Sequence, residues 1–150
     1  MSKFSLPEDL KFNRGLIKHP ESYLEEVGCI SWLCLTGEEF AVMDGGLSYD
    51  QVRKATPLSM NVVSDPPRVL DLNLARKHVF ALDNLQRPTL VSCRVGPRSS
   101  AVAYMYAGLK QGAEPDEVIQ VAESDNAPFI AFDEYKEWVR NSIETLRKEK

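Results

Sequence analysis

The sequence predicts an α/β protein in which helices flank a mostly parallel central sheet. Segments with helical and strand-like patterns alternate along the chain, and this alternation is typical of βαβ units. A short β-prone run at 88–92 leads to Cys93, and the apolar stretch 101–107 that follows predicts a helix. The chain has 150 residues, 43% of them hydrophobic, and is predicted to be a single domain, 1–150, with its own core.

The first predicted helix begins near Pro20 and ends at Gly28. Proline is tolerated in the first turn of a helix, and glycine commonly ends helices. A β-prone segment, 29–35, follows at once and predicts a strand. Cys29 and Cys34 within it are expected to fill core positions, since unpaired cysteines are among the most buried residues.

A turn and a short helix are predicted to separate this strand from the next one. The run Asp44-Gly45-Gly46 predicts the turn. Ser48 is a candidate N-cap for a short helix that runs to about Ala55 and is closed by Pro57. The residues 60–64 then predict a buried strand.

Two longer helices are predicted from apolar residues at helical spacing. The first spans about 69–85, with apolar positions at Leu70, Leu74, Phe80 and Leu82. His78 lies within it and is expected at the surface or boundary of the helix, outside the catalytic machinery. The second spans about 132–147 and is predicted to pack on the core through Phe132, Tyr135, Trp138, Val139, Ile143 and Leu146.

The most informative segment is Cys93-Arg94-Val95-Gly96-Pro97-Arg98-Ser99-Ser100, here called the cysteine loop. It is predicted to connect a strand to a helix, so that backbone N–H groups converge on one spot and bind an oxyanion. The same amides and the helix dipole favour the thiolate form of Cys93. Arg98 could place two hydrogen bonds on the anion. The predicted anion-binding residues are therefore Arg94, Val95, Gly96, Pro97 and Arg98. The alternative is a buried structural cysteine beside a surface arginine.

Charge and cysteine content exclude several classes of function. The formal net charge is -4 and no basic stripe is present, so nucleic-acid binding is not expected. No apolar run approaches the roughly 20 residues of a membrane span, and residues 1–7 lack the apolar segment of a secretory signal. We therefore expect a cytoplasmic protein without membrane contact. Three cysteines without ligand spacing predict neither a disulfide scaffold nor a metal site, and no cofactor is predicted.

A candidate general acid follows the strand predicted at 60–64. Ligands of parallel sheets bind beyond the carboxyl ends of the strands, so the loop after Val63 and the loop after Ser92 are expected to face each other. This places Asp65 near Cys93. The sequence Ser-Asp-Pro-Pro at 64–67 is also ordinary turn chemistry, which is the alternative reading. Asp71 is expected to belong to the next helix, and Asp44 and Asp125-Asn126 are weaker substitutes.

The order of these segments resembles the cysteine phosphatases of the dual-specificity type, and more closely the phosphatase-like domain of beta-lactamase-hydrolase-like proteins. The resemblance covers most of the chain and includes Asn13-Arg14-Gly15, 20–35, 60–67, the cysteine loop and 109–118. It implies a cysteine-phosphatase-like fold and an anionic small-molecule or phosphoprotein substrate. It also implies that Cys93 is the nucleophile, that Asp65 protonates the leaving group and that Ser99 hydrogen-bonds the sulfur. Ser99 or Ser100 is alternatively a helix cap.

Two departures from the phosphatase pattern leave the reaction open. Phosphatases have five residues between the nucleophile and the arginine, whereas four separate Cys93 from Arg98. Rhodanese-type sulfurtransferases resemble the chain at this point, through Cys93, Arg94, Gly96 and Arg98. Ser92 stands where phosphatases carry a histidine. Three functions therefore remain: phosphate-ester hydrolysis, which the whole pattern slightly favours, sulfur transfer through a persulfide on Cys93, and non-catalytic anion binding.

Overall fold

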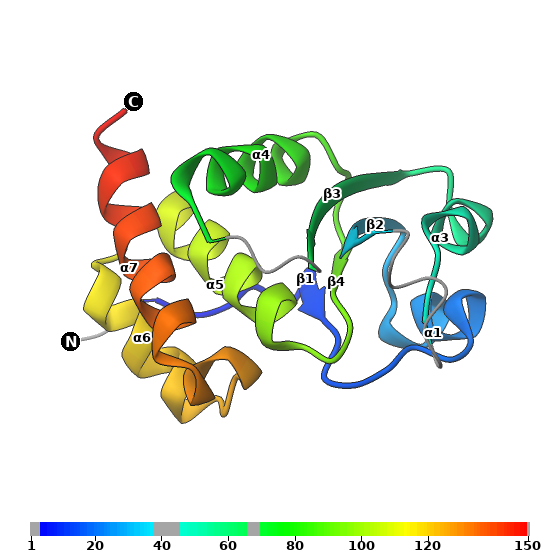
Figure 1. Ribbon diagram of the computed structural model, residues 1–150, viewed down its shortest axis with the longest axis horizontal. Helices are drawn as coiled ribbons and strands as arrows, with labels where there is room; N and C mark the ends of the chain where they lie inside the picture. The colour runs from blue at the N-terminus through cyan, green and yellow to red at the C-terminus, as the bar shows by residue number, and fades with distance from the viewer. Residues whose placement is uncertain (1–3, 38–45, 66–69, 150) are drawn as a thin grey trace.

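Four parallel strands form the central sheet of the computed structural model, which describes residues 4–37, 46–65 and 70–149 (Figure 1). The strands are β1 (Leu10–Phe12), β2 (Ser31–Thr36), β3 (Ser59–Asp65) and β4 (Thr89–Ser92). Their order across the sheet is β1-β4-β2-β3, and every neighbouring pair is parallel. The carboxyl ends of the strands therefore lie at the same edge of the sheet, as the sequence predicted.

Helices cover both faces of this sheet. They are α1 (Pro20–Val27), α3 (Tyr49–Ala55), α4 (Leu72–Asp83), α5 (Pro97–Gln111), α6 (Pro115–Ser124), the short 3-10 helix η1 (Pro128–Ala131) and α7 (Asp133–Arg147). α4 and α5 pack on one face, with α6 and α7 against α5, whereas α1 and α3 cover the other face (Figure 1). None of the helices in the described ranges is long and apolar enough to cross a membrane.

The central strand β2 divides the core between the two faces, and all of its residues are buried. Leu33 and Leu35 join the larger cluster around α5, whereas Trp32 and Cys34 join the smaller cluster under α1 and α3. Successive side chains of a strand point to opposite faces, so a strand covered on both faces carries apolar residues toward both, here from Trp32 to Leu35. Cys29 and Cys34 are buried, as the sequence predicted.

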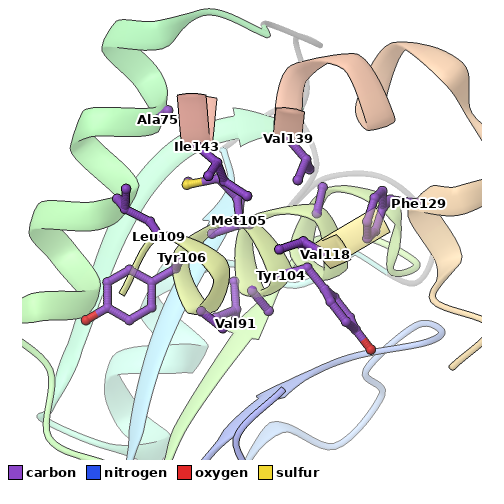
Figure 2. Close-up of a cluster of buried hydrophobic side chains, with 14 of the residues drawn as sticks. Ala75, Val91, Tyr104, Met105, Tyr106, Leu109, Val118, Phe129, Val139 and Ile143 are labelled. Carbon is purple, nitrogen blue, oxygen red and sulfur yellow. The ribbon is translucent and has the colours of Figure 1, made fainter. Parts of the chain in front are cut away.

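The helix that follows the cysteine loop, α5, is buried from residue 98 to residue 109. Figure 2 shows its side chains Tyr104 and Met105 in the cluster that also contains Val91 of β4 and Ile143 of α7. A Cβ atom at Gly108 would lie 2.6 Å from Cγ2 of Val118. Glycine at this position therefore lets α6 approach α5 closely.

Most predicted elements are confirmed. α1 has a left-handed glycine, Gly28, directly after it, and the Ser48 hydroxyl caps α3 by accepting a hydrogen bond from the N–H of Gln51 at 3.2 Å. The helix predicted at 69–85 is shorter, because Asp71 caps α4 by accepting a hydrogen bond from the N–H of Leu74 at 2.7 Å. Asp44 and Gly45 of the predicted turn lie outside the described residues.

Four predictions about burial and capping are wrong. The strand predicted at 60–64 is not buried throughout, because β3 lies at the edge of the sheet and Val63 is 49% exposed. The buried face of α4 consists of Leu74, Ala75, His78, Ala81 and Leu82, which share one side of a helix. His78 is therefore completely buried, not at the surface, and Phe80 on the opposite side is 64% exposed. In α5, Pro97 occupies the first turn and no side chain caps the helix, so neither Ser99 nor Ser100 is a cap.

Candidate active site

Cys93 directly follows β4, and its sulfur lies where amide groups of the cysteine loop converge. The Sγ atom accepts hydrogen bonds from the backbone N–H groups of Gly96 and Ser99, each at 3.2 Å. The Ser99 hydroxyl oxygen lies 3.4 Å from the same sulfur. Because N–H donors at a helix N-terminus stabilise negative charge, this geometry favours a thiolate over a thiol.

Gly96 shapes the turn between Cys93 and α5. Its φ angle is +121°, a conformation that residues with a side chain rarely adopt. A Cβ atom here would also lie 2.7 Å from the carbonyl oxygen of Asn13 and 3.1 Å from Cγ of Pro128. Both the backbone angle and the neighbouring atoms therefore require glycine at this point.

The side chain of Asn13 holds the cysteine loop in place. In the sequence, Asn13 belongs to the segments that resemble phosphatases, but no role was predicted for it. Asn13 is completely buried. Its Oδ1 accepts hydrogen bonds from the N–H of Cys93 at 3.1 Å and from the Ser99 hydroxyl at 2.9 Å. Its Nδ2 donates to the carbonyl oxygens of Cys93, Arg94 and Gly15 at 2.8, 3.2 and 2.9 Å. Asn13 directly follows β1 and Cys93 directly follows β4, and these two strands are paired. The side-chain amide of Asn13 therefore continues the hydrogen bonding between the two strands and fixes the backbone of Cys93.

Ser92 does not take the place of the histidine that phosphatases carry before the cysteine. The indole N–H of Trp32 donates to the Ser92 hydroxyl oxygen at 2.7 Å, and Trp32 belongs to the smaller core cluster. The Ser92 side chain therefore faces the side of the sheet covered by α1 and α3. Asn13 supplies the contact that orients the cysteine.

Arg98 lies in the first turn of α5, and its side chain is completely buried. Its guanidinium carbon is 5.4 Å from the centre of the Tyr135 ring, a cation–π contact between α5 and α7. The other predicted loop residues differ in exposure. Arg94 is partly exposed, Val95 is 44% exposed, and Pro97 occupies the first turn of α5.

Asp65 is the last residue of β3, and the structure describes its backbone alone. β2 lies between β3 and β4, so strand spacing places the ends of these two strands about 10 Å apart at one edge of the sheet. Among the weaker candidates, Asp71 caps α4, and Asp125 accepts a hydrogen bond from the Tyr104 hydroxyl at 2.6 Å. Asp44 lies outside the described residues.

A narrow cleft reaches Cys93, which is only 4% exposed. The cleft is lined by Leu16, Ile17, Thr36, Gly46, Leu47 and Arg94. Its described walls are therefore mostly apolar, and Arg94 contributes a positive charge. Within the described parts of the chain, no group of three or more His, Cys, Asp or Glu side chains could hold a metal ion.

The other two thiols have surroundings that differ from those of Cys93. Burial raises the pKa of Cys29 to about 11. Burial also raises the pKa of Cys34, whose sulfur lies 3.4 Å from the Thr36 hydroxyl oxygen. Both thiols therefore stay protonated at neutral pH.

Comparison with solved structures shows that the fold is that of tyrosine and dual-specificity phosphatase-like proteins. PTPMT1 is 15% identical with a TM-score of 0.69, and the match covers 96% of this chain and 95% of PTPMT1. A DUF442 protein from Shewanella putrefaciens CN-32 is 20% identical with a TM-score of 0.65, over 94% and 87% of the two chains. TpbA from P. aeruginosa is 16% identical with a TM-score of 0.56, over 93% and 85%. No family model and no curated protein matches the sequence. The fold implied by the sequence resemblance is thus confirmed.

Proposed function

We propose that this protein is a cysteine-dependent phosphatase that hydrolyses a phosphate ester through a covalent intermediate on Cys93. The observation that carries the proposal is the pair of hydrogen bonds from the N–H groups of Gly96 and Ser99 to the Cys93 sulfur. The fold is consistent with this chemistry. Among its structural neighbours, PTPMT1 has been solved with PI(5)P and TpbA with pTyr. Both ligands carry a phosphate ester, so we expect an anionic phosphate ester as substrate here.

The reaction has two steps. First, the Cys93 thiolate attacks phosphorus and forms an S–P bond, while the bond to the leaving oxygen breaks and Asp65 gives that oxygen a proton. The loop amides and Arg98 stabilise the charge on the phosphoryl oxygens. Second, water attacks phosphorus and gives a proton to the Asp65 carboxylate. The S–P bond breaks, inorganic phosphate leaves, and the released thiolate again accepts hydrogen bonds from the N–H groups of Gly96 and Ser99.

Two assays on one preparation test the proposal. The first measures phenol release from an aryl phosphate, and the second measures thiocyanate formation from thiosulfate and cyanide, each with Cys93→Ser as the blank. We expect the wild type to be active in the first assay and Cys93→Ser to be inactive. Thiocyanate formation without phenol release would show that the protein is a sulfurtransferase and not a phosphatase. Activity in neither assay would favour a non-catalytic anion-binding domain.

Sulfur transfer is the second candidate because four residues, not five, separate Cys93 from Arg98. In that reaction Cys93 takes the outer sulfur of thiosulfate, sulfite leaves, and cyanide then removes the sulfur as thiocyanate. Asp65→Asn distinguishes the two reactions. A phosphatase needs a proton for a phenoxide or alkoxide, so the variant should lose about 10² to 10⁴ in rate on esters with poor leaving groups, and far less on good ones. Sulfite is a stable anion, so thiosulfate turnover should stay unchanged.

Activation of Cys93 can be measured without a known substrate. Iodoacetamide at neutral pH should modify Cys93 faster than Cys29 or Cys34, because burial raises the pKa of both other thiols. Inorganic phosphate or arsenate should slow the labelling of Cys93, since we expect these anions to bind the N–H groups of the cysteine loop. Equal labelling of the three thiols in the native protein would remove the basis for an activated nucleophile.

A further inference from the structure

Two buried aromatic rings, His78 of α4 and Trp138 of α7, hold the residues on either side of the segment that carries Asp65. The Nε2 atom of His78 lies 3.1 Å from the hydroxyl oxygen of Ser64, the residue before Asp65. The indole N–H of Trp138 donates to the carbonyl oxygen of Asp71 at 3.0 Å. The two rings meet edge to face, with centroids 5.7 Å apart. One packed pair therefore fixes the chain both before and after this segment.

The direction of the bond between His78 and Ser64 follows from counting protons. The Ser64 hydroxyl has one proton and donates it to the carbonyl oxygen of Val62 at 2.8 Å. The hydroxyl oxygen must therefore accept its second bond from the N–H at Nε2 of His78. Nδ1 of His78 is then unprotonated and has no hydrogen-bond partner among the described residues. Burial and the positive charge of Arg98 lower the pKa of His78 to about 3, so this neutral tautomer persists at neutral pH.

The candidate anion-binding arginine lies in the same buried cluster. The guanidinium of Arg98 contacts the ring of Tyr135, which precedes Trp138 by three residues on α7. His78 and Arg98 are completely buried, and Ser64, Tyr135 and Trp138 are between 1% and 4% exposed. Close-packed interiors transmit small displacements to their neighbours. A change at His78 therefore reaches the end of β3.

We propose that His78 is a positioning residue that, braced by Trp138, fixes the end of β3 so that Asp65 reaches the leaving oxygen while Cys93 attacks. This inference rests on the phosphatase function proposed above. His78 acts through the hydroxyl of Ser64 and does not touch the substrate. Misplacing a reacting group by about 1 Å can cost on the order of 10² in rate, so the loss of one anchoring bond should be measurable.

The test uses three variants that change the same bond in different ways. His78→Phe keeps a ring against Trp138 and removes the donor, Ser64→Ala removes the acceptor, and His78→Gln keeps a donor near the position of Nε2. We expect His78→Phe and Ser64→Ala to lose about tenfold or more in rate on aryl phosphates with poor leaving groups, and less than about twofold with good ones. His78→Gln should recover most of this loss. His19→Phe is the matched control, because His19 is exposed.

A second comparison separates positioning from a general structural effect. In an Asp65→Asn background, His78→Phe should cause no further change in the dependence on the leaving group. A lower melting temperature with the wild-type dependence would mean that His78 is structural, and would overturn the inference. If His78→Phe does not fold, the same comparison of leaving-group dependence and melting temperature is made with Ser64→Ala.

Failure of the proposed function has a different signature. The wild type would then release no phenol from any aryl phosphate, while iodoacetamide still labelled Cys93 first. The inference on His78 would fall with it. An active wild type whose His78 and Ser64 variants keep its leaving-group dependence would instead refute the inference alone.

Discussion

Replacing Asn13 by alanine should both destabilise the protein and slow alkylation of Cys93. The substitution removes the partners that the Asn13 amide gives to the buried N–H and carbonyl groups of Cys93, at 3.1 and 2.8 Å. Each buried group that loses its partner costs about 1 to 3 kcal/mol, so the free energy of unfolding should fall by about 2 to 6 kcal/mol. This is a large share of the roughly 5 to 15 kcal/mol that stabilises a typical domain. The amides that face the Cys93 sulfur would also lose their fixed position.

Urea unfolding measures the global effect, and the rate of iodoacetamide labelling under native conditions measures the local effect at Cys93. Asn84→Ala is the control. Nδ2 of Asn84 donates to the carbonyl oxygen of Phe80 at 2.7 Å, but the side chain is exposed at the end of α4. Its loss should cost no more than about 1 kcal/mol and leave the labelling of Cys93 unchanged. A cost below about 1 kcal/mol for Asn13→Ala, together with wild-type labelling, would refute the role given to Asn13.

Three other outcomes are expected. Gly96→Ala should lower the melting temperature and abolish the protection of Cys93 by phosphate, since the new Cβ would lie 2.7 Å from the Asn13 carbonyl oxygen; wild-type melting and protection would contradict this steric argument. Arg98→Lys should fold but lose on the order of 10² in phosphatase rate, because lysine lacks the planar fork; a wild-type rate would make Arg98 structural. His78 should make the protein less stable in acid, because burial and the positive charge of Arg98 lower its pKa from 6.5 in the unfolded chain to about 3 in the folded protein. Between these values the unfolded chain alone binds this proton, so the free energy of unfolding falls by up to about 1.4 kcal/mol per pH unit as the pH drops. In His78→Gln, the free energy of unfolding measured in urea should fall less between pH 7 and pH 4 than in the wild type. An equal fall in the two proteins would show that His78 does not cause the loss of stability in acid.

The elements and the place of Cys93 could be predicted from the sequence because each depends on neighbouring residues. Pro20 and Gly28 mark the ends of α1 through backbone angles that are properties of those two residues. Ser48 caps α3 through a bond to a residue three positions away. The convergence of amides on the Cys93 sulfur also involves only residues of the cysteine loop. The fold class followed from the alternation of such local patterns.

The residues that hold the site in place could not be predicted, because their contacts depend on the order of the strands. Asn13 and Cys93 are 80 positions apart, and their bonds exist only because β1 lies beside β4. No local pattern in the sequence gives that order. His78 was misplaced for a related reason. Helical periodicity identifies a buried face from its apolar residues, so a polar residue on that face is assigned to the surface unless its partner, here Ser64, is known.

The two departures from the phosphatase pattern have one physical consequence in common. With serine at position 92, the side chain before Cys93 is bound by Trp32 on the face of the sheet covered by α1 and α3. The orientation of Cys93 then depends on Asn13, which also accepts a hydrogen bond from the Ser99 hydroxyl. The loop has four residues between Cys93 and Arg98, and Ser99, in the first turn of α5, donates its N–H to the sulfur at 3.2 Å. The shorter loop and Asn13 therefore form one arrangement, in which β1 fixes the loop backbone and the start of α5 supplies the donors. A change that separated β1 from β4 would therefore free both the loop backbone and the N–H donors that face the Cys93 sulfur.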